Sequence, residues 1–306
     1  MNDIIEQVQT WLPSWQGRVR SVTTLGGGIT NKNYKVTVDD EAFVVRVCAT
    51  NMGIHGINRQ AEHQCNLAAA GIGISPALIA FLDNLPGGKA VFVHQFITGR
   101  TLTPDEIRSP DHLSAIVAIM QRYHALPNFA GRFDVFRIFA NGLAFARDKH
   151  APLPPFIDQV QAEMQQIEAA FQRDPLPLAA CHNDLLASNC LVNQQGRLWL
   201  LDWEYAGWGD PFFDLGNLAV NNEFDDAADE ALLTAYWGQV TAPHLARLKL
   251  MKIVSDAREG IWAMVQWSIS DLEFDFAAYG QRHLERFMHN CASPAVKGWL
   301  RELNKK

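Results

Sequence analysis

The chain has 306 residues, of which 48% are hydrophobic and 19% are charged, and these values exclude a mostly disordered or fibrous protein. At ~150 residues per domain, the length suits two packed units. Twenty-six Lys and Arg stand against 33 Asp and Glu, so the net charge of −7 offers no basic field for a nucleic acid and mildly suits a cationic ligand.

The first third of the chain predicts strands around one helix. Alternating or continuous apolar residues mark five strands, at 19–25, 33–38, 42–47, 77–82 and 90–97. A helix is expected over 58–70, where small and apolar residues repeat at helical spacing until Gly71. Arg46 is conspicuous, because the rest of its strand is apolar.

Helical periodicity dominates after Gly99. The expected helices cover 110–126, 155–172, 226–237, 242–270 and 273–291. A hairpin interrupts them, with strands at 190–192 and 198–201 joined by a polar turn. The junction between the two parts falls near Thr98 and Gly99 and predicts a tight hinge.

A glycine-rich segment, LGGGITNKNY at 25–34, lies between the first two strands. Glycines let backbone N–H groups approach an anion closely. A dinucleotide-binding fingerprint needs a helix after its glycines, and here a strand follows, so that interpretation fails. Two others stay open: a flap over nucleotide phosphates, with Asn31 replacing the third glycine of the kinase pattern, and a plain hairpin turn.

Asp184, Asn189 and Asp202 form the strongest chemical pattern, because all three fall on loops next to short strands. Phosphoryl transfer needs a carboxylate at the attacking hydroxyl and oxygen ligands for Mg²⁺. Asp184 suits the base, and Asn189 and Asp202 suit the metal. Each residue alone is typical of a cap or turn, but together they indicate a kinase-type site.

Arg46 and Glu62 form a second candidate pair. A cation in a covered strand needs a partner, and a glutamate on the following helix is the simplest candidate. Together they would hold the α- and β-phosphates of a nucleotide. The alternative is a surface ion pair on an edge strand.

These motifs resemble the choline/ethanolamine kinase family, within the aminoglycoside-phosphotransferase branch of the protein-kinase-like superfamily. The resemblance runs from about Val22 to Met288 and rests on GGGITNKNY, VVRV, QFITGR, CHNDLLASNCLV and LLDWEYAGWGDPFFDLGN. It implies an α+β, bilobal protein-kinase-like fold. Residues 1–97 would be a nucleotide-binding lobe with a small antiparallel sheet and one helix, and residues 98–306 a larger, mainly helical lobe for catalysis and acceptor binding.

The resemblance also implies site residues. Asp184 is the catalytic base, Asn189 and Asp202 are the metal ligands, and Asp214 braces the catalytic loop. The nucleotide site would contain Gly28, Thr30, Asn31, Arg46, Glu62, Gln95 and Ile97. Trp262 and Tyr279 correspond to aromatic walls for a quaternary ammonium, and we also expect Glu204 on the substrate side. Aromatic faces suit a cation that lacks N–H donors, although packing in the core explains both rings equally well.

Two features depart from the family pattern. Asn221 and Asn222 stand where choline-type members of eukaryotes carry acidic residues. Glu259 stands one helical turn before Trp262, where another aromatic residue is expected, and it is a candidate to supply the negative charge instead.

We therefore predict an ATP- and Mg²⁺-dependent kinase that transfers the γ-phosphate to the hydroxyl of choline or a related amino alcohol. The alternatives are thiamine or an aminoglycoside as acceptor, or a non-catalytic pseudokinase that senses a ligand. A protein kinase is disfavoured, because no DFG or APE pattern follows Asp202. The chain lacks an apolar run of ~20 residues and a signal-peptide pattern, so we expect a cytoplasmic protein without a membrane partner. Its five cysteines, without a CxxC pair, indicate reduced packing residues, and the oligomeric state stays open.

Overall fold

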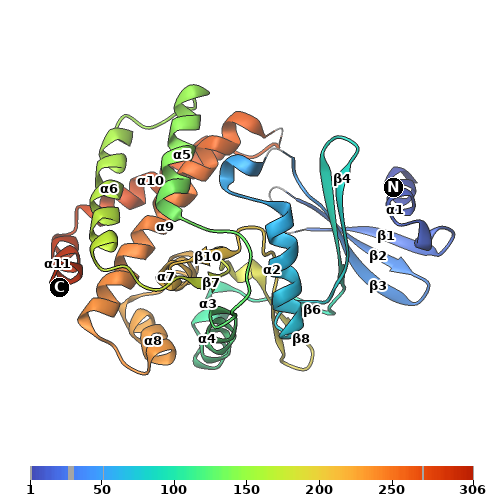
Figure 1. Ribbon diagram of the computed structural model, residues 1–306, viewed down its shortest axis with the longest axis horizontal. Coiled ribbons are helices and arrows are strands. Elements are labelled where there is room, and N and C mark those ends of the chain that lie inside the picture. Colours follow the sequence, from blue (N-terminus) through green and yellow to red (C-terminus); the bar gives the residue numbers. More distant parts are fainter. Residues whose placement is uncertain (1, 27–30, 51, 271, 306) are drawn as a thin grey trace.

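The protein consists of a twisted sheet and, beside it, a larger group of helices (Figure 1). A computed structural model describes residues 2–26, 31–50, 52–270 and 272–305. The predicted fold class, an antiparallel sheet followed by a mainly helical part, is confirmed. Among the described residues, no helix combines the length and hydropathy that crossing a membrane requires.

The sheet has five antiparallel strands in the spatial order β1-β2-β3-β5-β4. In chain order they are Val19–Leu25, Lys32–Val38, Glu41–Val47, Leu78–Leu85 and Lys89–Gln95. A helix absent from the prediction, α1 (Asn2–Trp11), packs over one face of the sheet. It does so through Val8, which shares a buried cluster with strand residues such as Val36 and Val45.

Helix α2 (Arg59–Gly71) lies between the sheet and the helical part (Figure 1). The side chain of Asn58 caps its first turn by accepting hydrogen bonds from the backbone N–H groups of Gln60 and Ala61. The buried Cys65 and Ala69 on α2 belong to the same hydrophobic core as the C-terminal helices. Packing therefore continues across the sequence boundary at residue 97, and the division into lobes at that point stays a prediction.

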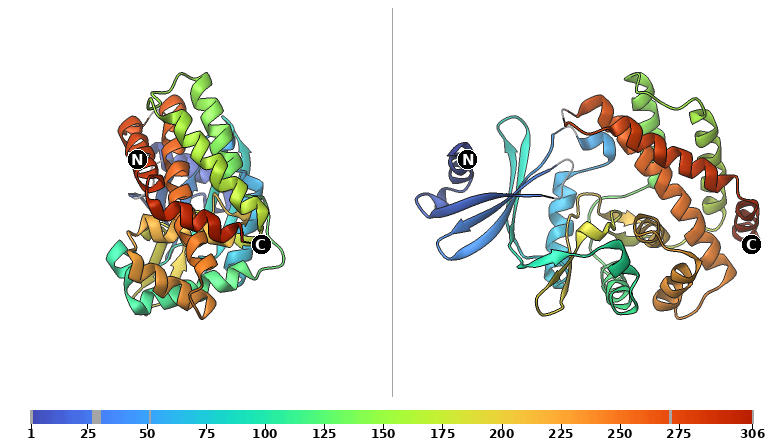
Figure 2. Two further views of the ribbon diagram at one scale, coloured as in Figure 1. Left: turned by 90° about the vertical axis from the view of Figure 1, so that its left-hand side faces the viewer. Right: turned by 180° about the vertical axis from the view of Figure 1, so that it is seen from behind.

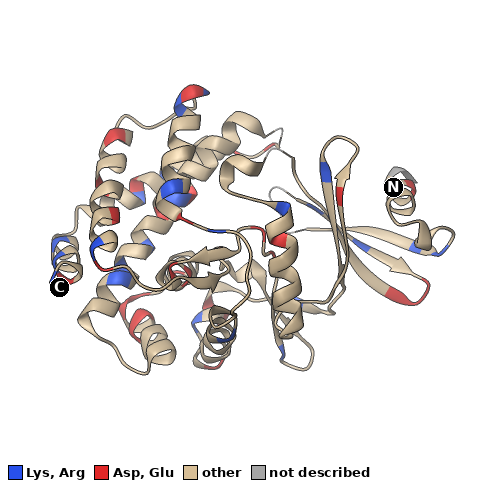
Figure 3. Cartoon of the chain, viewed as in Figure 1, with Lys and Arg blue, Asp and Glu red and all other residues tan. Residues whose placement is uncertain are grey.

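The helical part contains nine α-helices within the described residues. They are α3 (Pro104–Arg108), α4 (Pro110–His124), α5 (Val135–Asp148), α6 (Ile157–Arg173), α7 (Pro211–Asn221), α8 (Asp226–Trp237), α9 (Ala242–Ile269), α10 (Phe276–Cys291) and α11 (Pro294–Leu303). The five predicted helices are present with shifts of a few residues at their ends. Figure 3 shows Lys and Arg spread over both parts of the molecule and interspersed with Asp and Glu.

Helix α9 is the centre of this part, and α5, α7, α10 and α11 pack against it (Figure 2). Helices α7 and α9 approach each other closely at Gly216. A Cβ atom at this position would lie 2.7 Å from the carbonyl carbon of Met251 and 2.9 Å from the backbone nitrogen of Lys252. Because these atoms belong to the backbone, only glycine fits here.

Short strands hold two loops between the sheet and the helices. The predicted hairpin consists of β8 (Cys190–Asn193) and β9 (Leu198–Leu200), and β6 (Gly99–Thr101) adds a third strand to it. A second pair joins β7 (Ala179–Cys181) to β10 (Gly207–Gly209). One loop, 182–189, connects β7 to β8, and the other, 201–206, connects β9 to β10.

Candidate active site

The two loops carry backbone conformations that side chains usually avoid. Asn183, which precedes Asp184, has a φ of 66°, and Asp202 in the second loop has a φ of 63°. Left-handed conformations of non-glycine residues cost energy and persist only where their surroundings hold them. The side-chain amide nitrogen of Asn183 donates to the backbone carbonyl oxygen of Tyr205 at 3.0 Å, so the two loops are also hydrogen-bonded to each other.

Asp214, in the first turn of α7, holds the first loop through hydrogen bonds to the loop backbone. One carboxylate oxygen accepts the backbone N–H of His182 at 2.9 Å, and the other accepts that of Asn183 at 2.6 Å. Burial alone would raise the pKa of Asp214, but the donors around it, the nearby His124 foremost, lower it below its ordinary value. An ionised Asp214 therefore fixes the backbone directly before Asp184.

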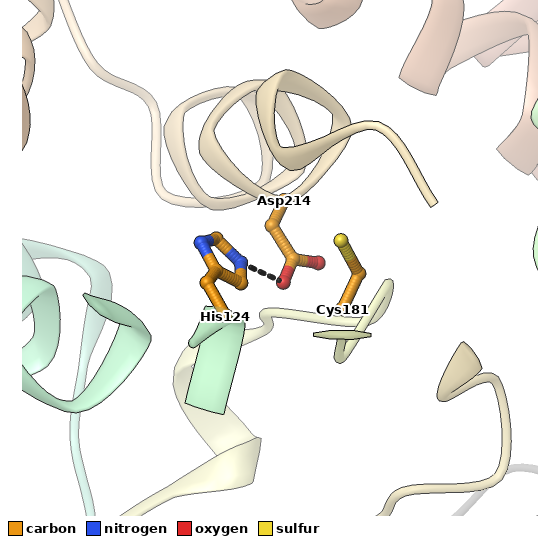
Figure 4. A group of neighbouring side chains, drawn as sticks. All are labelled: His124, Cys181 and Asp214. Carbon is orange, nitrogen blue, oxygen red and sulfur yellow. Dashed lines mark hydrogen bonds and ion pairs between the residues drawn. The ribbon is translucent and has the colours of Figure 1, made fainter. Parts of the chain in front are cut away.

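His124, Cys181 and Asp214 lie close enough together to suggest a metal site (Figure 4). The carboxylate of Asp214 is already saturated, however. It accepts a hydrogen bond from Tyr123 at 2.7 Å and one from His124 Nε2 at 3.0 Å, besides the two backbone bonds. This group is therefore a hydrogen-bonded brace.

Two asparagines, one in α7 and one at its C-terminal cap, support the first loop in a way that the sequence did not predict. Asn217 accepts the backbone N–H of Leu185 at 2.6 Å, and Asn222 donates to its carbonyl oxygen at 3.1 Å. Asp214 and Asn217 are three residues apart and share one face of the helix, a spacing that could have indicated the pair. Asn222, which departs from the family's acidic pattern, thus supports the loop.

Asp184 and Asn189 face each other across the first loop. The amide nitrogen of Asn189 donates to the Asp184 backbone oxygen at 2.8 Å and to its carboxylate at 3.2 Å, which leaves the amide oxygen as the end available to a cation. Burial first, and then the neighbouring carboxylates with Glu259 foremost, raise the pKa of Asp184 to about 8 against an opposing attraction from Arg258.

Arg46 connects the sheet to the second loop. Its guanidinium forms ion pairs with Glu62 on α2 and with Asp202. The predicted pairing with Glu62 is confirmed, and the alternative of an edge strand is wrong, because β3 lies between β2 and β5. Burial disfavours the charge of Arg46, but the carboxylates, Asp202 first, raise its pKa above the ordinary value.

Glu204 ties three segments together. Its carboxylate accepts hydrogen bonds from Asn31 at 2.9 Å and from Arg59 at 3.0 Å, and Arg59 also pairs with Glu62 at 2.7 Å. Asn31 belongs to the glycine-rich segment at 25–34, in which the predicted Gly28 and Thr30 lie outside the described residues. The sequence analysis missed Arg59, because an arginine at the first position of a helix gives no signal of burial.

A cavity of about 540 Å³ collects most of the predicted site residues. Its lining includes Asn31, Arg46, Gln95, Ile97, Asp184, Asn189, Asp202, Glu204, Trp262 and Tyr279. Glu62 is fully buried behind Arg46 and does not line it. Glu259 on α9, the candidate source of negative charge, lines it as well, and so does its neighbour Arg258, which the sequence did not indicate.

Aromatic rings border the cavity beside Glu259. The ring centroids of Trp262 and Tyr279 are 6.1 Å apart with planes at 72°, and Phe276 lies 5.9 Å from Trp262. The hydroxyl of Tyr279 donates to Glu259 at 3.4 Å. Trp262 is also part of the hydrophobic core, so both the packing and the cavity-wall interpretations describe it.

These features define the class of kinase-like phosphotransferases: a small sheet, a helical part, and a cavity between them that is lined by two loops with acidic residues. Residues 21–250 match the model of the phosphotransferase enzyme family, so the chain belongs to that family. The predicted enzyme class, a phosphotransferase that acts on an alcohol group, is confirmed at this level.

Named relatives agree with the resemblance seen in the motifs. Protein LicA of Haemophilus influenzae is 28% identical over 256 residues, which cover 78% of this chain and 72% of LicA. The solved structure of a choline/ethanolamine kinase family protein from Mesorhizobium loti has a TM-score of 0.83 and 26% identity, covering 100% of this chain and 99% of that one. A structure of LicA in complex with AMP has a TM-score of 0.76 and 25% identity, covering 95% and 97%. The resemblance to the choline/ethanolamine kinase family is confirmed.

Proposed function

We propose that this phosphotransferase acts on an amino alcohol, and that it moves the γ-phosphate of ATP, with Mg²⁺, to the hydroxyl of choline or a close relative. One observation carries the proposal. The same cavity is lined by Asp184, Asn189 and Asp202 and by an aromatic wall with a buried carboxylate, so phosphate chemistry and cation binding share one space.

The nucleotide would occupy the side of the cavity lined by the sheet, and residues 1–97 would form the lobe that binds it. Arg46, held by Glu62, would meet the α- and β-phosphates, and Gln95 and Ile97 would bind adenine through their backbone. Asn31, with Gly28 and Thr30, would cover the phosphates. The complex of the related LicA with AMP supports nucleotide binding by this chain.

Asn189 and Asp202 would hold Mg²⁺, which neutralises phosphate charge during transfer. Their chemistry fits a hard cation, because the amide oxygen of Asn189 has no hydrogen-bond donor among the described residues and Asp202, although paired with Arg46, offers a carboxylate. Asp184 would accept the proton of the acceptor hydroxyl. The hydrogen bonds from α7 and Asn189 would hold this base at the attack position.

The acceptor would lie among Asp184, Glu259, Trp262 and Tyr279, in the lobe formed by residues 98–306. Aromatic faces attract a quaternary ammonium by ~0.5 to 2 kcal/mol each, and Glu259, which is paired with Arg258, places a carboxylate beside them. The acidic groups lining this region, Asp184 and Glu259, share one arginine, which suits a single positive charge better than a polycationic aminoglycoside. The assignment of Glu204 to the substrate side stays a prediction, because Asn31 and Arg59 engage its carboxylate.

Coupled ADP release tests the proposal, with Mg·ATP and choline, ethanolamine, thiamine or kanamycin as acceptor. We expect turnover with choline or ethanolamine that disappears without Mg²⁺ and falls by ~10³ or more in Asp184→Ala, with ATP affinity nearly unchanged. Trp262→Leu should raise the choline KM more than the ethanolamine KM. Turnover with thiamine or kanamycin alone would discard the amino alcohol, and an Asp184→Ala enzyme of normal activity would discard the base.

A further inference from the structure

Arg258 has no role in the function proposed so far, although it lines the cavity next to the acceptor position. It lies on α9, one helical turn before Trp262, and only 3% of its surface is exposed. Its guanidinium lies over the ring of Tyr205 with a distance of 4.1 Å to the centroid. The Tyr205 ring and the surrounding core therefore fix the position of the guanidinium.

The hydrogen bonds of Arg258 are incomplete. Its Nη1 donates to Glu259 and lies 3.9 Å from Asp184 Oδ1. Its Nη2 is buried and has no hydrogen-bond partner among the described residues. Buried donors are nearly always paired in folded proteins, and an exception needs a reason such as a ligand or a catalytic role.

General reaction distances indicate how far the reacting phosphorus lies from Asp184, beside which Arg258 lies. A hydroxyl that gives its proton to Asp184 lies ~2.6 to 3.2 Å from the carboxylate. The phosphorus that the hydroxyl attacks lies ~3 to 3.5 Å further on. Arg258 Nη1 lies 3.9 Å from Asp184 Oδ1, so the guanidinium and a transferring phosphoryl group would both lie within ~7 Å of this carboxylate.

We propose that Arg258 is a catalytic residue that binds the phosphoryl group as it passes from the nucleotide to the acceptor. A bond forms between the acceptor oxygen and the γ-phosphorus, and the bond to the β-phosphate oxygen breaks with its electron pair leaving on ADP. The acceptor proton goes to Asp184. Arg258 exchanges no proton and stabilises the negative charge of the phosphoryl oxygens, as arginines do in other phosphotransferases.

This inference rests on the proposed phosphoryl transfer but not on the identity of the acceptor. A different role would be local: Arg258 could serve only as the counter-ion of Glu259. In that case its removal would change the acceptor KM and leave the transition state unaffected. A measurement without acceptor, on the binding of a mimic of the phosphoryl group, therefore distinguishes a catalytic Arg258 from a mere counter-ion of Glu259.

The test compares the wild type with Arg258→Gln, Arg258→Lys and the control Arg247→Gln. Arg247 is equally buried on α9 and also has a donor without a hydrogen-bond partner, but it pairs with Asp174 and does not line the cavity. Calorimetry would measure the Kd of Mg·ADP with and without aluminium fluoride, a mimic of the phosphoryl group in transit. Melting temperatures of all variants would report folding.

We expect aluminium fluoride to tighten Mg·ADP binding in the wild type and in Arg247→Gln. In Arg258→Gln the tightening should fall by ~10²-fold, with Mg·ADP alone unchanged within about threefold, and kcat should fall by ~10² to 10³. Arg258→Lys, which keeps a buried cation, should lose at least about tenfold in kcat and serves if the glutamine variant does not fold.

Three results would overturn the inference: no tightening in the wild type, full tightening in the Arg258 variants, or a change confined to the acceptor KM. Arg258-dependent tightening together with silence toward all amino alcohols would keep the inference and discard the proposed acceptor.

Discussion

Replacing Asp184 with Asn should stabilise the fold while it destroys turnover. Without nucleotide or Mg²⁺, the buried carboxylate has its pKa raised from 3.8 to about 8, so the folded protein holds a proton that the unfolded chain releases. Between these two values the folded state binds more protons, and the free energy of unfolding therefore decreases as pH rises. Asn carries no charge in either state and removes this cost.

The size of the gain follows from the same shift. Each pH unit above 3.8 costs ~1.4 kcal/mol, so at pH 7 the carboxylate costs up to ~4 kcal/mol. In a protein of this size, 1 kcal/mol moves the melting temperature by ~2 to 4 °C. The Asn variant should therefore melt several degrees higher at neutral pH, and by a smaller margin in acid.

Thermal melts of the wild type and Asp184→Asn, at pH 5 and pH 7.5 without nucleotide or Mg²⁺, would measure this. Asp40→Asn is the matched control, since Asp40 is exposed and should give no gain at either pH. A gain of equal size at both pH values, or no gain at all, would refute burial of the carboxylate as the source of the effect. ADP release should fall by ~10³ or more in the same variant.

Three further predictions concern the surroundings of the site. Burial lowers the pKa of His94 to about 3, so the folded state resists protonation, and the free energy of unfolding should fall by ~1.4 kcal/mol per pH unit below pH ~6.5. Urea unfolding at pH 5 and 7 should show a smaller pH dependence in His94→Gln than in the wild type. An equal pH dependence in both proteins would contradict this role of His94. Asp214→Asn should lower kcat by ~10² with KM values nearly unchanged, because the backbone N–H groups of His182 and Asn183 lose their anionic acceptor. Steady-state kinetics would measure this, and an unchanged kcat would show that the loop does not need Asp214. Gly216→Ala should cost ~2 kcal/mol or more in chemical denaturation, because its methyl group meets backbone atoms, and a cost below about 0.5 kcal/mol would mean that the helices separate easily.

Local sequence patterns predicted most elements of the fold. The strands β1 to β5 and the helices α2, α4, α6, α8, α9 and α10 follow from apolar periodicity and their end signals. Helix α7 could not be found this way, because its residues are buried on nearly all sides and show no polar face. A helix without a solvent-facing side gives no amphipathic signal.

The candidate site was predictable where chemistry restricts the residue type. The pairing of Arg46 with Glu62 was predicted from the single charge in an apolar strand. The second partner of Arg46, Asp202, is 156 residues away, and no local pattern indicates that contact. Arg258 was missed for a similar reason. Nothing local separates it from Arg247 on the same helix, and only the folded structure brings it next to Asp184.

The contact at Gly216 limits how this enzyme can acquire a new substrate. Helix α7, which holds the loop at 182–189, touches the backbone of α9, which carries Arg258, Glu259 and Trp262. A shift of α9 that enlarged the acceptor pocket would disturb the loop as well. Divergence among related enzymes should therefore proceed by exchanging side chains on α9 and α10, while the helix positions are inherited unchanged.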